Sequence, residues 1–422
     1  MAIGLALGPD ARTHLLAYLA LFAAGSLVAM GSARSLSGSS TAFLLLSGGL
    51  LRATLLLRSS DLSDDVRRYA WDARVGAAGI SPYAYAPSDP AVSQLAPAVA
   101  VAVPHADVRT VYPPAAQAAF RTARLLGGDV ALRVFFAAAD LSIVALIAAM
   151  GGAEAGFGAA LYAFHPLPIT ESAGQGHLDS LGVALLVASV VFLFRGARGR
   201  AGVAFALSAM TKYVSLAATL PLVRRGKGKL LAAALAVGMA LWALASKGGV
   251  SPLGGLPEYA ERWEFNAPVY SGLAALLDAG NVPVAAKDLF MDLKAWIGHP
   301  AWTQRVFPYF YAGFLARAIL GMILAAALLV IGWKVHDTET AVFASLGALL
   351  LCSPTLHPWY LLWILPFAAR RREPAFLYLS FAAPVSYALL YPVSWLPKAA
   401  VYAIEYVPFA ALATRTLRRR GA

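Results

Sequence analysis

Long uncharged apolar segments recur along this chain, and they constrain its fold more than any other feature. Many windows of about 17 to 23 residues contain almost no charged side chain, which is the length that a helix needs to cross a hydrocarbon layer of roughly 30 Å. Of the 422 residues, 59% are hydrophobic and only 13% are charged. Because the alternating pattern of a membrane barrel is absent, we expect helical spans. The sequence therefore predicts an all-α polytopic membrane protein.

The net charge of +12 comes largely from short loops between the apolar segments. Four basic clusters stand out, at Arg195–Arg200, Arg224–Lys229, Arg370–Arg372 and Arg415–Arg420. Such loops mark the cytoplasmic side of a membrane, so we expect a multi-pass protein of the cell membrane and no nucleic-acid partner. The single cysteine, Cys352, excludes a disulfide within the chain and a cluster of thiolate metal ligands.

The apolar segments, threaded between these loops, predict one membrane domain over residues 1–422. Its larger outer loops are 58–129 and 247–307. Segment 201–223 has basic loops on both sides, so we expect two short helices that enter the membrane and return, with a break near Lys212. This lysine is expected on the inner half, in a structural contact far from the outer acids. About 11 to 13 transmembrane helices are expected; besides the two short helices of 201–223, they lie near 14–31, 41–57, 130–149, 154–170, 180–194, 230–246, 308–331, 339–353, 359–369, 375–391 and 399–414.

Aspartates gather at the start of the first outer loop, in the stretch SDLSDDVRRYAWD. A carboxylate near the membrane surface is partly desolvated, which raises its basicity and suits it to act as a general base. We expect Asp65 or Asp64 to act as this general base. Asp61 and Asp72 are expected to pair with Arg67, Arg68 or Arg74 or to cap the following helix, and the same structural role is the alternative for the adjacent pair.

Other polar groups of the predicted outer face are candidates for binding a substrate. The turn ESAGQGHLDS carries Glu171, His177 and Asp179, which are able to bind a sugar hydroxyl, a phosphate or a metal. Two potential ligands two residues apart are a weak metal signal, and a solvated turn with Asp179 as a helix cap is the alternative. No cofactor is required by these residues, and a divalent metal stays open. His357 begins a very short helix that we expect to sink below the surface.

Proline and tyrosine are frequent in the stretch GISPYAYAPSDP of the first loop, which includes Tyr83. Such residues form rigid loops with aromatic surfaces that stack against sugar rings. In the second loop, Arg262 and Asn266 are further candidates for contact with a bound substrate. No glycine-rich phosphate loop stands before a helix, so the sequence does not predict a nucleotide-binding site.

Six motifs in order carry a family resemblance: SDDVRRYAWDARVGAAGISPYAYAPSD, VYPPAAQAAF, GQGHLDSLG, ALSAMTKYVSLAATLPLV, WEFNAPVY and SPTLHPWYLLWILP. Over about residues 41–370 the chain resembles the GT-C glycosyltransferases that use polyprenyl-phosphate sugars. It is similar to the polyprenol-phosphate-mannose-dependent enzymes and, distantly, to GPI mannosyltransferase I. Members often show a D-x-D pair in the first outer loop, where this chain has adjacent aspartates, so either Asp64 or Asp65 is left as the base, with Asp65 favoured.

This resemblance implies an inverting mannosyltransferase that moves a sugar from a polyprenyl-phosphate donor to a lipid or glycan acceptor on the outer face. Its partners are then the donor, the acceptor and the membrane lipids. Glucose or arabinose is an alternative sugar. A transporter or flippase is the rival from another class, but it requires acids inside helices and related halves. Asp140 is the main deep acid, and no internal symmetry is found.

The departing phosphate needs groups that neutralise it. The resemblance suggests His357 for this role, together with Arg67 or Arg68. Trp359 and Tyr360 are then expected beside the lipid chain.

Overall fold

The computed structural model describes residues 1, 4, 8, 10–58, 60–95, 103–298, 300–391 and 396–421. Within these residues the chain is helical, and one isolated β-bridge joins Phe265 to Thr355. Four described helical segments are long and apolar enough to cross a membrane, and further apolar helices are shorter. The predicted all-α polytopic class is confirmed. The four are Leu15–Ser32, Val130–Ala149, Tyr213–Ala245 and Ala312–Lys334.

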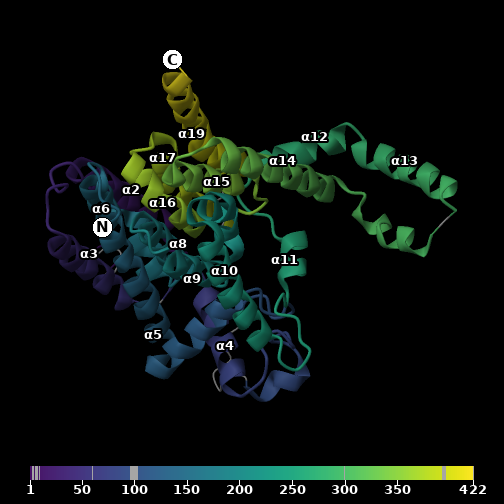
Figure 1. Ribbon diagram of the computed structural model, residues 1–422, viewed down its shortest axis with the longest axis horizontal. Helices are drawn as coiled ribbons and strands as arrows, with labels where there is room; N and C mark the ends of the chain where they lie inside the picture. The colour runs from purple at the N-terminus through teal and green to yellow at the C-terminus, as the bar shows by residue number, and fades with distance from the viewer. Residues whose placement is uncertain are drawn as a thin grey trace.

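The first half of the chain forms the helices α2 to α9, drawn from purple to teal in Figure 1. Within α5, the backbone turns at Gly127 and Gly128, whose φ values of 144° and 78° favour glycine. The part of α5 after this turn is the predicted span 130–149. The elements are α2 (Leu15–Ser32), α3 (Thr41–Leu56), α4 (Asp65–Ala77), η1 (Pro90–Leu95), α5 (Pro114–Ala149), α6 (Ala155–Phe164), α7 (Pro166–Pro168), the π-helical turn η2 (Ile169–Gly174), α8 (Asp179–Phe194) and α9 (Arg198–Ala209).

The second half begins with a 3₁₀ turn and ends in a long C-terminal helix. In Figure 1, α12 and α13 extend away from the remaining helices, and α12 packs on α14 through Tyr270 and Leu320. The elements are η3 (Tyr213–Ala218), α10 (Thr219–Ala245), α11 (Leu256–Arg262), α12 (Pro268–Ala279), α13 (Val282–Trp296), η4 (Ala301–Arg305), η5 (Phe307–Tyr309), α14 (Ala312–Lys334), α15 (Thr338–Cys352), η6 (Pro358–Trp363), α16 (Leu365–Arg371), α17 (Pro374–Ala382), η7 (Ala383–Ser386), α18 (Tyr387–Leu390) and α19 (Lys398–Gly421).

The chain reverses between α9 and η3, at the break that the basic loops predict. Helix α9 packs against α8 and α10, and the approach is close because a Cβ at Gly202 would lie 2.3 Å from the Leu230 carbonyl oxygen. Lys212 lies at the tip of this hairpin, beside Asp179. The expectation that Lys212 lies far from the acids is therefore wrong, because its Nζ lies 2.7 Å from Asp179 Oδ1. The 12 residues of α9 rise about 18 Å along the helix axis.

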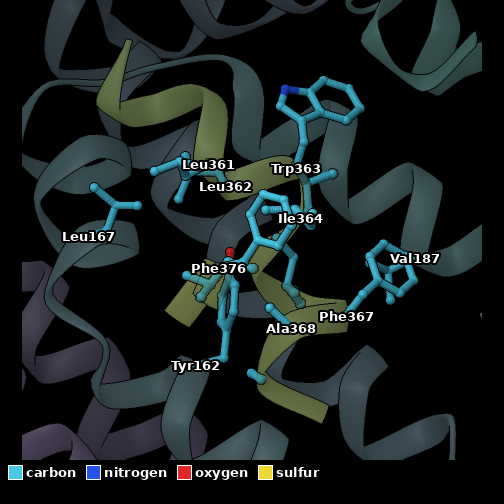
Figure 2. Packing of buried hydrophobic residues seen from close by; sticks show 14 of the residues in the cluster. Tyr162, Leu167, Val187, Leu361, Leu362, Trp363, Ile364, Phe367, Ala368 and Phe376 are labelled. Atoms are coloured by element: carbon cyan, nitrogen blue, oxygen red, sulfur yellow. The ribbon is translucent and has the colours of Figure 1, made fainter. Parts of the chain in front are cut away.

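Apolar packing around η6 and α16 forms the centre of the main core. Figure 2 shows Trp363, Ile364 and Phe367 packed among Tyr162, Val187 and other side chains of this cluster. The Trp363 side chain is fully buried, and a Cβ at Gly182 would lie 2.5 Å from its ring. Helix α8 thus approaches η6 closely only because position 182 has no side chain.

The deep acid Asp140 is part of a closed polar cluster. Its carboxylate accepts from Arg52 Nε at 2.6 Å and from the Tyr162 hydroxyl at 2.7 Å, and all three side chains are buried. A buried carboxylate is stabilised only by such partners. Asp140 therefore has the contacts of a structural ion pair, not those of an open path for a transported substrate.

Candidate active site

A cavity of about 540 Å³ lies between the start of α4, the tip of the α9–η3 hairpin, α11 and the segment that leads into η6. It brings together both predicted outer loops and the motif HPWY. Many of its walls are aromatic, and one wall is formed by aliphatic side chains of α15. The lining includes Asp64, Asp65, Arg68, Tyr69, Arg109, Lys212, Tyr259, Phe265, Leu349, Leu350, His357, Trp359 and Tyr360.

The two adjacent aspartates have different partners. Asp64 Oδ1 lies 2.8 Å from Arg12 Nη2 and 3.1 Å from Arg67 Nη1, and its side chain is 33% exposed. Asp65, the first residue of α4, forms neither of these contacts, and its Oδ2 lies 3.4 Å from Nδ1 of His177. Asp65 therefore faces the cavity with an imidazole as its ionic partner, whereas Asp64 is bound by two arginines.

The segment before α4 is held by the turn of residues 171–180, for which a solvated position was the alternative to substrate binding. Gln175 Oε1 accepts from the backbone amides of Asp61, Leu62 and Ser63 at 2.9 to 3.2 Å. Gly176 has a φ of 75°, and a Cβ there would lie 2.5 Å from Val66. Residues 171–180 are buried throughout. The solvated-turn alternative is therefore wrong, because this turn packs beneath α4 and sets the position of Asp65.

His177 lies between two carboxylates. Its Nε2 is 3.4 Å from Glu171 Oε2, and the imidazole stacks on Trp359 with the ring centroids 3.9 Å apart. Burial lowers the pKa of His177, but Asp65 and Glu171 outweigh this effect and raise it to about 9. Burial raises the pKa of Asp65, yet His177 holds it below its ordinary value. At neutral pH the site therefore contains an imidazolium facing an ionised Asp65.

His357 stacks on the same tryptophan, Trp359, and also on Phe265. Its ring lies 4.3 Å from Trp359 and 4.3 Å from Phe265, and no described residue forms a hydrogen bond with its buried Nδ1. Burial lowers the pKa of His357 to about 3, with Lys212 adding to this effect against the attraction of Asp65. His357 is therefore a neutral imidazole with an unused polar nitrogen at the cavity.

Lys212 supplies a cation from the hairpin tip. Its Nζ lies 2.7 Å from Asp179 Oδ1 and 4.0 Å from the centroid of the Tyr360 ring. The same carboxylate oxygen accepts from Trp363 Nε1 at 2.7 Å. Asp179 is buried and heads α8, so it holds Lys212 in place instead of capping the helix. Lysine has further N–H donors that Asp179 does not use.

Several sequence expectations for polar residues need correction. Arg67 pairs with Asp64 and is absent from the cavity lining, whereas Arg68 lines it but donates to the carbonyls of His105 and Val108. Arg68 therefore holds the loop that covers the site. Tyr83 is buried and donates to the Tyr112 carbonyl, so it forms no part of the lining.

The expected arginine pairing is confirmed for Asp72, which lies 3.2 Å from Arg68. Asp61 also pairs with an arginine, but its partner is Arg58, at 2.6 Å, and not one of the three that were expected. In the second loop, Tyr259 and Trp263 line the cavity, whereas the two acceptor candidates do not. Arg262 is 61% exposed, and Asn266 donates to the buried Glu405.

No role was expected of Gln175 or of Tyr387, whose hydroxyl donates to Glu171 at 2.9 Å, and only a structural contact was expected of Lys212. Only Lys212 carried a usable signal, because the length of the helix before it predicts how far the tip reaches. The other two act over 112 or more residues of sequence. Among the described residues, no group of three histidine, cysteine, aspartate or glutamate side chains is arranged to hold a metal ion.

Comparison with known proteins identifies the family. The model of glycosyltransferase family 87 matches residues 110–354, a segment that contains Glu171, His177, Asp179 and Lys212. No curated protein and no solved structure matches the chain, so the distant similarity to GPI mannosyltransferase I is not supported. The matched segment covers more than half of the chain and ends just before His357. This membrane protein therefore belongs to glycosyltransferase family 87.

Proposed function

We propose that the protein transfers a sugar, with mannose our choice, from a polyprenyl phosphate to a hydroxyl of a lipid or glycan acceptor. The observation that carries this proposal is the pairing of an ionised Asp65 with a separate set of polar groups, Lys212 and His357, in one cavity. The family supplies the general activity of sugar transfer. The side of the membrane follows from the basic loops, which favour an outward-facing site.

Asp65 is the proposed base. The acceptor oxygen attacks the anomeric carbon, the bond from that carbon to the phosphate oxygen breaks, and Asp65 takes the acceptor proton. Attack from the side opposite the phosphate inverts the anomeric carbon. The ionic partner of Asp65 is an imidazolium that favours its ionised form. Asp64 is a weaker candidate because two arginines already bind it.

Lys212 and His357 are the proposed partners of the leaving phosphate. The Lys212 ammonium is a fixed positive charge that stabilises the charge developing on the phosphate. A neutral His357 contributes one N–H donor. This assignment replaces Arg67 and Arg68, whose guanidinium groups hold Asp64 and a backbone loop.

A lipid-linked donor suits the walls of the cavity. Leu349 and Leu350 come from the apolar helix α15, and Trp359 and Tyr360 lie next to them in the lining. Apolar and aromatic surfaces of this kind accommodate an isoprenoid chain. A donor in the bilayer also reaches such a site laterally, without a soluble nucleotide domain.

Purified protein incubated with labelled polyprenyl-phosphate mannose and total membrane lipids tests the proposal. We expect a new mannosylated product that nucleotide sugars do not label. Glucosyl and arabinosyl donors tested in parallel identify the sugar. Efficient transfer from GDP-mannose in the absence of polyprenyl phosphate would contradict the proposed donor.

A further inference from the structure

A continuous row of polar side chains leads from the cavity into the core. Asp65, which is 29% exposed, is followed by the fully buried His177 at 3.4 Å and by the fully buried Glu171 at 3.4 Å. The Tyr387 hydroxyl lies 3.0 and 2.9 Å from the two oxygens of Glu171. These groups come from α4, the turn after η2, η2 itself and α18. Glu171 and Tyr387, at the far end of the row, do not line the cavity.

The two histidines beside Trp359 show what Glu171 contributes. Both rings stack on this tryptophan; His177 is fully buried, and His357 is partly buried with its Nδ1 inaccessible to solvent. His357 has no carboxylate within ion-pair distance among the described residues, and its pKa falls to about 3. His177 has two, and its pKa is raised to about 9. Since burial opposes the charged form of an imidazole, the carboxylates account for the difference.

A base in this cavity needs a neighbouring cation for a physical reason. The donor carries a negative phosphate, and a negative charge nearby raises the pKa of a carboxylate. Burial acts in the same direction. Without a compensating positive charge, Asp65 would become protonated as the donor binds, and it could no longer accept the acceptor proton.

We propose that Glu171 is a positioning residue that acts through His177: from its buried side it holds the imidazole as a cation against Asp65, and this cation keeps the base ionised while the anionic donor is bound. This inference rests on the proposed role of Asp65. Tyr387 fixes the Glu171 carboxylate by hydrogen bonds to both oxygens. The other ionisable groups that act on this row are Tyr69 on α4, Tyr112 before α5, Lys212 at the hairpin tip, Tyr259 on α11, His357 and Tyr360 near η6, and Tyr18 on α2.

The test is the pH dependence of kcat/KM for Glu171→Gln. This change removes one of the two carboxylates, so burial makes His177 neutral at a lower pH than in the wild type. Asp65 then loses its cation and its pKa rises. Because Asp65 works in its deprotonated form, the acidic limb of the profile is expected to move to higher pH by about one unit or more. The rate of the variant should approach the wild-type rate as the pH is raised.

Two further variants separate this effect from damage to the fold. Tyr387→Phe keeps the Glu171 charge but removes its hydrogen bonds, so we expect a shift in the same direction and of smaller size. Glu154→Gln is the matched control, because Glu154 precedes α6, pairs with Arg372 and is 46% exposed. Its profile should coincide with that of the wild type. All proteins are compared only when they are monodisperse in detergent.

The outcomes are distinct. A loss of rate in Glu171→Gln that is equal at every pH would overturn the inference, because it would mean that Glu171 only supports the fold. If Glu171→Gln does not give a monodisperse protein, an unshifted profile in Tyr387→Phe overturns the inference instead. Failure of the proposed function has another signature: Asp65→Asn would then keep the wild-type turnover, whatever the profile of Glu171→Gln.

Discussion

The clearest prediction concerns the adjacent aspartates, which differ by one residue in sequence but have separate surroundings. Asp65→Asn keeps the size of the side chain and removes proton acceptance, so we expect kcat to fall by about 10² to 10⁴, or about 2.7 to 5.5 kcal/mol of transition-state free energy. Asp64→Asn removes ion pairs whose members are 30 to 40% exposed. Each such pair contributes about 0 to 1 kcal/mol to stability. Asp64→Asn should therefore change the melting temperature slightly and keep kcat within a few-fold of the wild type.

The assay is sugar transfer from the lipid-linked donor under saturating conditions, with donor affinity measured separately for each variant. We expect Asp65→Asn to bind the donor with little change, because the substitution leaves Lys212 and His357 in place. The double variant should be as slow as Asp65→Asn alone. If Asp64→Asn abolished turnover and Asp65→Asn did not, the assignment from the two sets of ionic partners would be refuted. If the double variant kept near wild-type turnover, neither aspartate would be the base, and the catalytic carboxylate would have to be Glu171 or Asp179 of the buried turn.

Further predictions concern the phosphate groups and the topology. His357→Ala should weaken donor binding or leaving-group stabilisation with the protein still folded, and a normal donor affinity in the variant would contradict this role. The pH profile of kcat/KM of the wild type should show no titration of His357 between about pH 5 and 9, since the pKa of His357 is lowered to about 3. Lys212→Met should raise the donor KM and lower the melting temperature, because it leaves a buried carboxylate without its cation; unchanged values of both would exclude the ion pair. Engineered cysteines at Ser88 and Arg225, in a background lacking Cys352, should react with an impermeant reagent from opposite faces, and labelling from one face would overturn the threading.

The helical framework could be predicted from the sequence because its physical cause is local. Uncharged segments with the length of a membrane span are recognisable without any partner, and Leu15–Ser32, Val130–Ala149 and Ala312–Lys334 lie where such segments were expected. The fourth long apolar segment, Tyr213–Ala245, runs across the basic loop that was expected to separate two segments, and the backbone departs from helical geometry there only at Lys227, whose φ is 54°. The reversal at Lys212 followed from two basic loops that need the same side of the membrane. The contact of Lys212 with Asp179 did not follow, because it joins two elements that are 33 residues apart in sequence.

The candidate site could be predicted only in part. Asp65 and His357 were visible as unusual polar residues in two outer segments, and the structure brings both to one cavity. The burial of His177 and Glu171 was not visible, since a turn with several polar residues has the same composition whether it is solvated or covered. What covers it comes from η6 and α18, whose contacts with it span more than 180 residues of sequence. Such contacts have no local pattern.

The clamp on the segment before α4 has a consequence for the biosynthesis of the protein. Gln175 holds the amides of residues 61–63, and the Tyr391 hydroxyl donates to the Leu62 carbonyl at 2.9 Å. Both clamping side chains are translated long after the aspartates they position. In a nascent chain whose first outer loop has been synthesised, Asp64 and Asp65 are therefore not held in position until the last helices have entered the membrane. The growing protein is in this way kept from acting on its substrates before its own insertion is complete.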